Sequence, residues 1–169
     1  MARRFFALAL LLALAATAEA APAAPGFRLK TLDGRRTIDS NELIGKKIVV
    51  LRFQASYCKP CAKESPALNR LVERYRGRDV EIIAVHVQDT ATDTRTFLRA
   101  HKATYPVALD PRLSLGNRFG FKGTPYTVVI DRKGEIAERL AGEGAVRRLP
   151  PMLDRLLKEE GPETTPPRS

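Results

Sequence analysis

The stretch GKKIVVLRFQASYCKPCAKESPALNRL, residues 45–71, decides the fold. Residues 46–53 form a β-branched, largely apolar run, which predicts a strand covered on both faces. From residue 59 to 76, apolar side chains repeat at helical spacing, which predicts a helix. Cys58 and Cys61, the only cysteines of the chain, therefore lie where a buried strand passes into a helix.

A second buried strand is predicted at residues 80–87, so the stretch above opens a β-α-β unit with two parallel strands and a right-handed crossover. Turn residues at Asp33-Gly34 and at 131–134 predict two β-hairpins. The remaining predicted elements are a helical turn at 40–43, a helix at 90–103, a strand at 105–110, a helix at 112–119 and a last helix at 150–159 with Pro150 and Pro151 in its first turn. The pattern predicts an α/β protein with a central mixed sheet and flanking helices.

The N-terminus begins with MARR and continues with an apolar run at residues 5–18. That run is shorter than the roughly 20 residues that span a membrane, so we predict a cleaved signal peptide at 1–20, with an uncleaved anchor as the less favoured alternative. A linker is predicted at 21–26. One domain is predicted at 27–159, followed by a disordered tail at 160–169.

The chain is strongly basic, with 29 Lys and Arg against 19 Asp and Glu and a formal net charge of +10. Such a charge favours acidic partners or a weak association with a membrane surface. The arginines are scattered and lack the aromatic interleaving of a nucleic-acid-binding surface. We therefore predict no nucleic-acid partner.

Two cysteines are too few for a disulfide scaffold, so their spacing points to chemistry. The Cys58 sulfur is expected at the first turn of a helix, where unpaired N–H groups and the helix dipole lower a cysteine pKa from about 8.5. Cys61 lies one turn deeper on the same face and is expected to be less exposed. This predicts Cys58 as the nucleophile and Cys61 as the resolving thiol of a reversible dithiol.

Three other uses of the pair are less favoured. A zinc site needs two more ligands, and the only histidines, His86 and His101, belong to different predicted elements. A covalent haem site needs a histidine directly after Cys61, where Ala62 stands. A purely structural disulfide in so short a loop removes little entropy from the unfolded chain. We predict no metal and no cofactor.

Residues 45–71, together with GTPYTVVIDRKGEI at 123–136, resemble thioredoxin-like proteins of the TlpA and ResA type. The resemblance covers roughly residues 27–157. It implies a thioredoxin-like fold with an N-terminal β-hairpin and a strand-helix region inserted between its two halves. It also implies a thiol:disulfide oxidoreductase outside the cytoplasm, which often reduces disulfides of exported proteins during cytochrome c or cytochrome oxidase assembly and is itself re-reduced by a membrane electron donor.

The resemblance also implies roles for individual residues. Cys58 is the attacking thiol and Cys61 the resolving thiol. Pro125 follows a cis peptide bond, and the Thr124 backbone, facing the dithiol, pairs with a bound substrate strand. Glu64 is the carboxyl near the sulfurs, used for proton exchange or for tuning the thiols. The alternative for Glu64 is an ordinary exposed helical glutamate.

The chain departs from the family pattern at three positions. Tyr57, a predicted substrate contact, stands where many members have Trp, and Gln54 stands where they have another aromatic residue. Arg52 stands where this type has a neutral amide and thioredoxin has a buried acid. An arginine cannot accept the proton there, so its charge must reach solvent or find a partner, and it could further stabilise the thiolate.

Two rival functions remain. A copper-binding assembly chaperone would use the cysteines with His86, although such chaperones place three residues between their cysteines. We favour instead a hydrogen-bonded histidine at the end of a strand. A thiol peroxidase of the peroxiredoxin type sets Thr three residues before its reactive cysteine, and Ala55 occupies that place.

Overall fold

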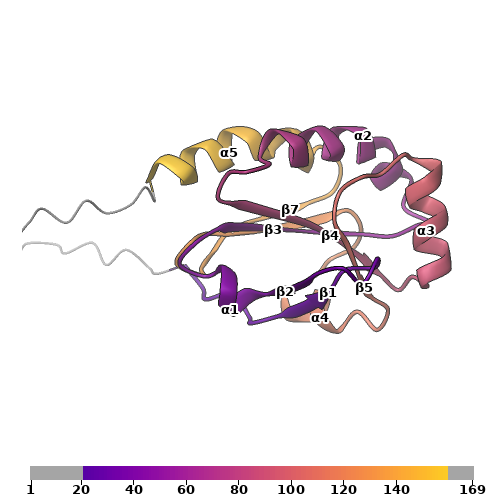
Figure 1. Cartoon of the computed structure of the whole chain (residues 1–169), viewed down its shortest axis with the longest axis horizontal. Helices are drawn as coiled ribbons and strands as arrows, with labels where there is room; N and C mark the ends of the chain where they lie inside the picture. The colour runs from indigo at the N-terminus through magenta and orange to yellow at the C-terminus, as the bar shows by residue number, and fades with distance from the viewer. Residues whose placement is uncertain (1–20, 160–169) are drawn as a thin grey trace, which may run out of the picture.

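The structure is a computed structural model that describes residues 21–159. The predicted signal peptide at 1–20 and the predicted tail at 160–169 lie outside the described residues. A five-stranded sheet with the order β5-β4-β3-β6-β7 forms the centre (Figure 1). Its strands are β3 (Ile48–Gln54), β4 (Val80–Val87), β5 (Val107–Asp110), β6 (Tyr126–Ile130) and β7 (Ile136–Ala141). β3, β4 and β5 are parallel, whereas β6 and β7 are antiparallel to their neighbours, so the predicted mixed sheet is confirmed.

Every residue of β3 is buried, because the apolar run sends alternate side chains into two separate cores. Ile48 and Val50 pack into the core under α2 and α5, whereas Leu51 and Phe53 pack into the core under the N-terminal hairpin. The strand that leads to the cysteines is thus fixed from both sides.

Helices α2 (Lys59–Arg74) and α5 (Ala145–Glu159) cover one face of the sheet, and α3 (Ala91–Ala100) stands at one end of it (Figure 1). The opposite face carries β1 (Arg28–Lys30), β2 (Thr37–Asp39), α1 (Ser40–Leu43) and α4 (Ser114–Arg118). The predicted helices and hairpins are confirmed to within a few residues, with one exception. In the described part of the chain, no helix is both long and apolar enough to cross a membrane.

The exception is α5, which begins at Ala145, five residues before the predicted start at Pro150. Both prolines lie inside the helix, so the prediction of a first-turn position was wrong. A stripe of buried apolar residues at Val146, Leu149 and Leu153 packs against the sheet along the whole element. Packing of this face maintains the helix although each proline removes a backbone hydrogen bond.

Part of the predicted linker is paired with the domain. Ala23 forms a β-bridge with Glu135, the Ala24 N–H donates to the Gly134 carbonyl at 2.8 Å, and the Ile136 N–H donates to the Pro22 carbonyl at 2.9 Å. The described chain therefore starts beside the first residues of β7.

A cross-brace holds the far end of α2 against α5. The Tyr75 hydroxyl lies 2.9 Å from the Asp154 carboxylate, and Arg74 forms an ion pair with the same carboxylate at 2.6 Å. Burial, followed by the hydrogen bond to Asp154, raises the pKa of Tyr75 to about 12. The helix that carries both cysteines is thus anchored at its C-terminal end.

Candidate active site

Cys58 and Cys61 lie where β3 ends and α2 begins, as predicted. Cys58 is the N-cap of α2, and its sulfur accepts the Cys61 N–H at 3.2 Å. The two sulfurs form a disulfide with their Cα atoms 5.2 Å apart. Cys58 is 5% exposed and Cys61 only 1%, so the outer sulfur is the one that a partner can reach. In the reduced state, the N–H of Cys61 and the positive end of the helix dipole would favour a thiolate on Cys58.

The exposed aromatic ring of Tyr57 directly precedes the outer cysteine. Its exposed fraction is 63%, and the other large apolar side chain exposed in residues 21–159 is Ile44, at 40%. Ile44 lies beside Gly134 in the β6–β7 turn, at the end of the sheet away from the cysteines. An exposed aromatic side chain at a redox site is suited to contact a protein substrate.

The peptide bond between Thr124 and Pro125 is cis, so this prediction is confirmed. Tyr126 pairs with Phe53, which places Pro125 at the same end of the sheet as the loop that leads to the cysteines. The Pro125 carbonyl accepts the N–H of Gly142 at 2.9 Å. The segment before β6 is therefore held in place by the turn that follows β7.

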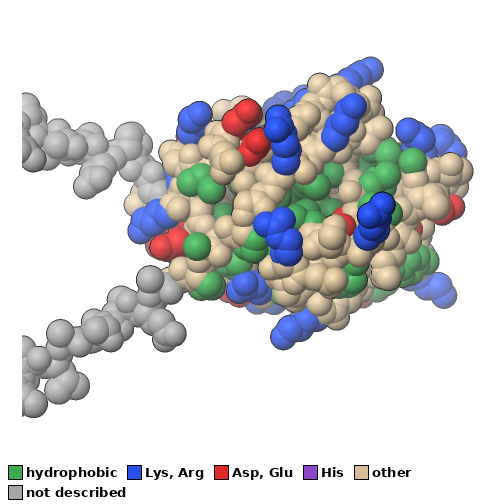
Figure 2. All heavy atoms as spheres, turned by 90° about the horizontal axis from the view of Figure 1, so that it is seen from below, with side chains coloured by type: hydrophobic (Ala, Val, Ile, Leu, Met, Phe, Trp, Pro, Cys, Tyr) green, Lys and Arg blue, Asp and Glu red, His purple; other side chains and the backbone are tan. Residues whose placement is uncertain are grey.

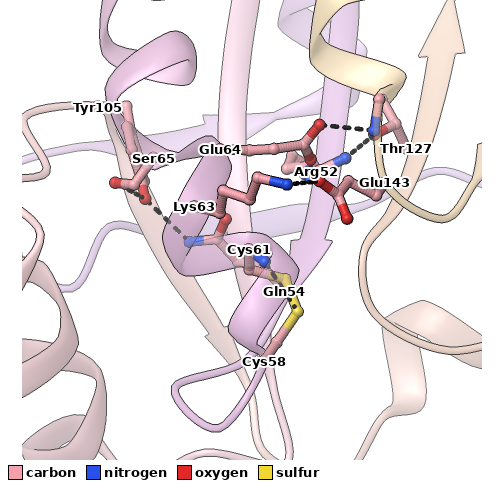
Figure 3. Close-up of polar contacts among 11 residues, drawn as sticks. Arg52, Gln54, Cys58, Cys61, Lys63, Glu64, Ser65, Tyr105, Thr127 and Glu143 are labelled. Carbon is pink, nitrogen blue, oxygen red and sulfur yellow. Dashed lines mark hydrogen bonds and ion pairs between the residues drawn. A yellow bond between two sulfur atoms is a disulfide. The ribbon is translucent and has the colours of Figure 1, made fainter.

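Glu64 is buried, at 9% exposure, and is not the exposed helical residue of the alternative interpretation. It stands three residues after Cys61, on the neighbouring turn of the same helix face. Its Oε1 accepts the N–H of Gly144 at 2.7 Å, and its Oε2 forms an ion pair with Arg52 (Figure 3). Both carboxylate oxygens are thus occupied.

Arg52 has found a buried partner instead of reaching solvent. Its side chain is 1% exposed, and besides Glu64 it contacts Thr127, to which Nη1 donates at 2.9 Å (Figure 3). Within the described residues, Nε has no hydrogen-bond partner. Burial lowers the pKa of Arg52, while the Glu64 charge opposes that change. A guanidinium remains charged even so, which makes Arg52 and Glu64 a buried ion pair.

A second polar network lies between β3, β4 and α2. Gln54 Nε2 is 2.7 Å from His86 Nε2 and donates to the Tyr105 hydroxyl at 3.2 Å. That hydroxyl is 3.0 Å from Ser65 Oγ, one turn beyond Cys61 on α2 (Figure 3). Gln54, where the family often has an aromatic residue, therefore joins two buried polar groups.

Asp89 connects His86 to the loop before the cysteines. Its Oδ2 is 2.7 Å from His86 Nδ1, and its two oxygens accept the Ser56 N–H and hydroxyl, each at 2.7 Å. Asp89 was not among the residues predicted from the sequence. The available signal was its position just after a buried strand, since the carboxyl ends of parallel strands meet at one edge of a sheet.

Phe97 was also missed. It comes from α3 and packs in one buried cluster with Ala55, Cys58 and Cys61, while its ring meets His86 edge-on at 5.2 Å between centroids. A single phenylalanine on an amphipathic helix carries no signal that distinguishes the dithiol from the rest of the core. The inserted helix therefore covers the disulfide with an aromatic ring.

The buried His86 should make the fold sensitive to acid. Burial lowers the pKa of His86, and Asp89 opposes this only in part. The unfolded chain then binds the proton first, so this contribution to stability is present above about pH 6.5 and is lost as the pH falls below it. Between pH 7.5 and 5.5 we expect the free energy of unfolding of the wild type to fall by up to about 1.4 kcal/mol because of His86. In His86→Gln this fall should be absent. Urea denaturation at both pH values measures it.

The control is His101→Gln, which removes the other histidine. If the pH dependence of stability persists in His86→Gln but disappears in His101→Gln, it belongs to His101 and the prediction is wrong.

Comparisons with known proteins show which family the chain belongs to. The family model described as the AhpC/TSA family matches residues 20–139. The thiol-disulfide oxidoreductase ResA of Bacillus cereus is 32% identical over 133 residues, covering 79% of this chain and 76% of the relative. The ResA of Halalkalibacterium halodurans is 32% identical over 143 residues, covering 85% and 80%.

Among solved structures, a Chlorobium tepidum protein described as a putative thiol:disulfide interchange protein DsbE matches with a TM-score of 0.70 and 26% identity. The match covers 84% of this chain and 97% of that protein. The thioredoxin-like fold is thus shown by structure as well as by sequence. The chain belongs to the AhpC/TSA family and is a thiol-disulfide oxidoreductase of the ResA and DsbE type.

Proposed function

We propose that the protein is an exported reductant of disulfides in partner proteins. The Cys58 thiolate attacks one sulfur of the partner's disulfide, the partner's other sulfur leaves as a thiolate, and a mixed disulfide forms. The Cys61 thiolate then attacks Cys58 and releases the partner's second thiol. Two electrons pass to the partner, and the Cys58–Cys61 disulfide remains.

The asymmetry of the two sulfurs carries this proposal. Cys58 caps the helix and receives the N–H of Cys61, whereas Cys61 is almost completely buried behind it. A partner meets Cys58 first, and Cys61 is placed to reach only the sulfur next to it. This is the arrangement that an attacking and a resolving thiol require.

The place and partners of the reaction are part of the proposal. The predicted signal peptide at 1–20 would export the chain to the periplasm or another extracytoplasmic space, where its substrates would be disulfide-containing exported proteins. The TlpA and ResA resemblance supports substrates of the cytochrome c or cytochrome oxidase assembly type and re-reduction by a membrane electron donor. The basic surface, part of which is seen in Figure 2, supports at most a weak association with a membrane surface.

The substrate is proposed to lie as an extended strand across the outer sulfur. The Thr124 backbone beside the cis-proline Pro125 would pair with it, and the exposed ring of Tyr57 would contact its side chains. Glu64 would act on the thiols through its charge, as a positioning residue.

Tyr57→Ala should therefore weaken substrate binding. Exposed tyrosines that become buried in an interface contribute about 1 to 2 kcal/mol, so we expect KM for a protein disulfide to rise about 5- to 30-fold. The rate at saturating substrate should change little. Steady-state reduction of a protein substrate measures both constants. Ile44→Ala is the control, because it removes the other exposed apolar side chain at the far end of the sheet. If both substitutions raise KM equally, Tyr57 is not a substrate contact.

The structure presents an obstacle to the copper alternative. Both ring nitrogens of His86 are engaged, one by Asp89 and one by Gln54. Phe97 meets that ring edge-on and packs in one buried cluster with the two cysteines. Copper binding by His86 would require breaking one of these hydrogen bonds.

Insulin reduction by the pre-reduced protein tests the proposal. We expect the B chain to precipitate far faster than with the small-molecule reductant alone. The same preparation is titrated with Cu(I) and offered hydrogen peroxide, so the rival functions are measured side by side. Absence of insulin reduction, together with stoichiometric Cu(I) binding that His86→Ala abolishes or with rapid peroxide turnover, would replace the proposal by the corresponding rival.

A further inference from the structure

The electron transfer described above does not account for Arg52, which forms a buried ion pair with Glu64. Arg52 lies in the middle strand and Glu64 on the redox helix, and their side chains are 1% and 10% exposed. Removing two charges from water costs several kcal/mol per ion, and their attraction repays this only when the geometry is favourable. Neutral side chains at both positions would avoid that cost.

We propose that Arg52 is a positioning residue of the dithiol: it balances the charge of Glu64 and holds that carboxylate in one place, so that the Cys58 thiolate faces a neutral pair. The proposal rests on the proposed role of Cys58 as the attacking thiol. It assigns to Arg52 the task of setting how readily that thiolate forms.

The contacts around the carboxylate fix its position. Glu64 is held by Arg52 on one oxygen and by the Gly144 N–H on the other. Glu143, which directly precedes Gly144, forms an ion pair with Lys63 of α2 at 2.6 Å (Figure 3). The carboxylate is thereby fastened to the turn 142–144 as well as to β3. A movement of the carboxylate away from this position would disrupt these contacts.

The same contacts connect the two halves of the site. Arg52 also contacts Thr127 of β6, and the Gly142 N–H donates to the Pro125 carbonyl just before that strand. The helix that carries the cysteines and the segment that carries the cis-proline are therefore joined through Glu64, Arg52 and the turn after β7. A substitution in the ion pair is therefore expected to affect both the helix with the cysteines and the cis-proline segment.

The two charges act on the thiolate with opposite sign. A nearby negative charge raises a thiol pKa and a nearby positive charge lowers it. Charges inside the protein are screened by salt much less than exposed charges. Because a guanidinium does not lose its proton in this pH range, Arg52 remains positive whenever the thiol titrates. Loss of one member of the pair should therefore expose the thiol to the other.

Other titratable or charged groups face this region from the surrounding elements, and they are left unchanged in the four test variants below. They are Lys59 and Lys63 on α2, His86 at the end of β4, Asp89 after it, Tyr105 before β5 and Glu143 after β7.

The test compares the pKa of the Cys58 thiol in four variants, measured from the pH dependence of alkylation of the reduced protein by iodoacetamide. We expect Arg52→Gln to raise it by about one unit and Glu64→Gln to lower it by about one unit. The double variant should return close to wild type, because no unbalanced charge remains. Arg52→Lys keeps the charge and should also stay close to wild type.

Lys63→Gln is the matched control, since it breaks an exposed ion pair on the same helix and should move the thiol pKa far less. A purely structural role would shift the two single variants in the same direction and leave the double variant no closer to wild type, and that result would overturn the proposal. If Arg52→Gln fails to fold, Glu64→Gln and the double variant still decide it. Alkylation needs no protein partner, so the thiol pKa values can be compared whether or not the protein reduces insulin. A wild type that fails to reduce insulin would contradict the proposed function but not the role of Arg52.

Discussion

Replacing Cys58 with serine is expected to lower the rate of insulin reduction by at least about 10³-fold. The outer sulfur is the atom that a partner's disulfide can reach, and serine supplies no thiolate at that place. The rate of insulin precipitation, measured against the small-molecule reductant alone, gives the size of the loss. No mixed disulfide with a protein substrate should form in this variant.

Cys61→Ser is the matched substitution and should give a different failure. Attack by Cys58 proceeds, but the hydroxyl cannot resolve the product, so the mixed disulfide accumulates and is visible on a non-reducing gel. The two variants thus separate attack from resolution. If Cys58→Ser traps substrate and Cys61→Ser does not, the roles of the two sulfurs are reversed.

Arg52→Met is expected to cost about 3 to 5 kcal/mol of the free energy of unfolding, because it leaves the Glu64 carboxylate buried without its partner. Glu64→Met should cost a similar amount for the opposite charge. The double variant should recover most of the loss, since two apolar side chains of similar volume leave no buried charge. Urea denaturation of the oxidised proteins measures all three.

An exposed ion pair provides the control for this series. Arg74 and Asp154 are paired at 2.6 Å, but their side chains are 51% and 31% exposed. Arg74→Met should therefore cost no more than about 1 kcal/mol. If the double variant loses the sum of the two single losses of stability, Arg52 and Glu64 are not coupled. The two losses would then come from local packing around each residue.

Much of the fold is predictable from local patterns. The apolar run before Cys58 and the helical repeat after it predict β3 and α2, and the Asp33-Gly34 turn predicts the first hairpin. These signals come from neighbouring residues, and tertiary packing favours the same elements here. The predicted start of α5 was wrong because Pro150 and Pro151 are typical of a first helical turn. The helix begins earlier because its apolar stripe packs against the sheet from Val146 onward.

The candidate site was predictable in its sulfurs and less so in its surroundings. The spacing and placement of Cys58 and Cys61 carry their own chemical meaning, and the cis bond before Pro125 was implied only by the family resemblance. Arg52 and Glu64 stand in the opening stretch, 12 residues apart, yet only the packing of the helix on the strand brings their charges together. The Asp89 contact to Ser56 spans 33 residues and depends on strand order in the same way.

The reduction potential of the Cys58–Cys61 couple, measured by equilibration with glutathione at pH 7, tests the central claim most directly. It reports the relative stability of the reduced and oxidised forms, and 30 mV corresponds to about 1.4 kcal/mol for this two-electron couple. A reductant of exported proteins requires a potential more negative than about −200 mV. A potential near −120 mV, the range of dithiols that oxidise their partners, would contradict the proposed direction of electron transfer.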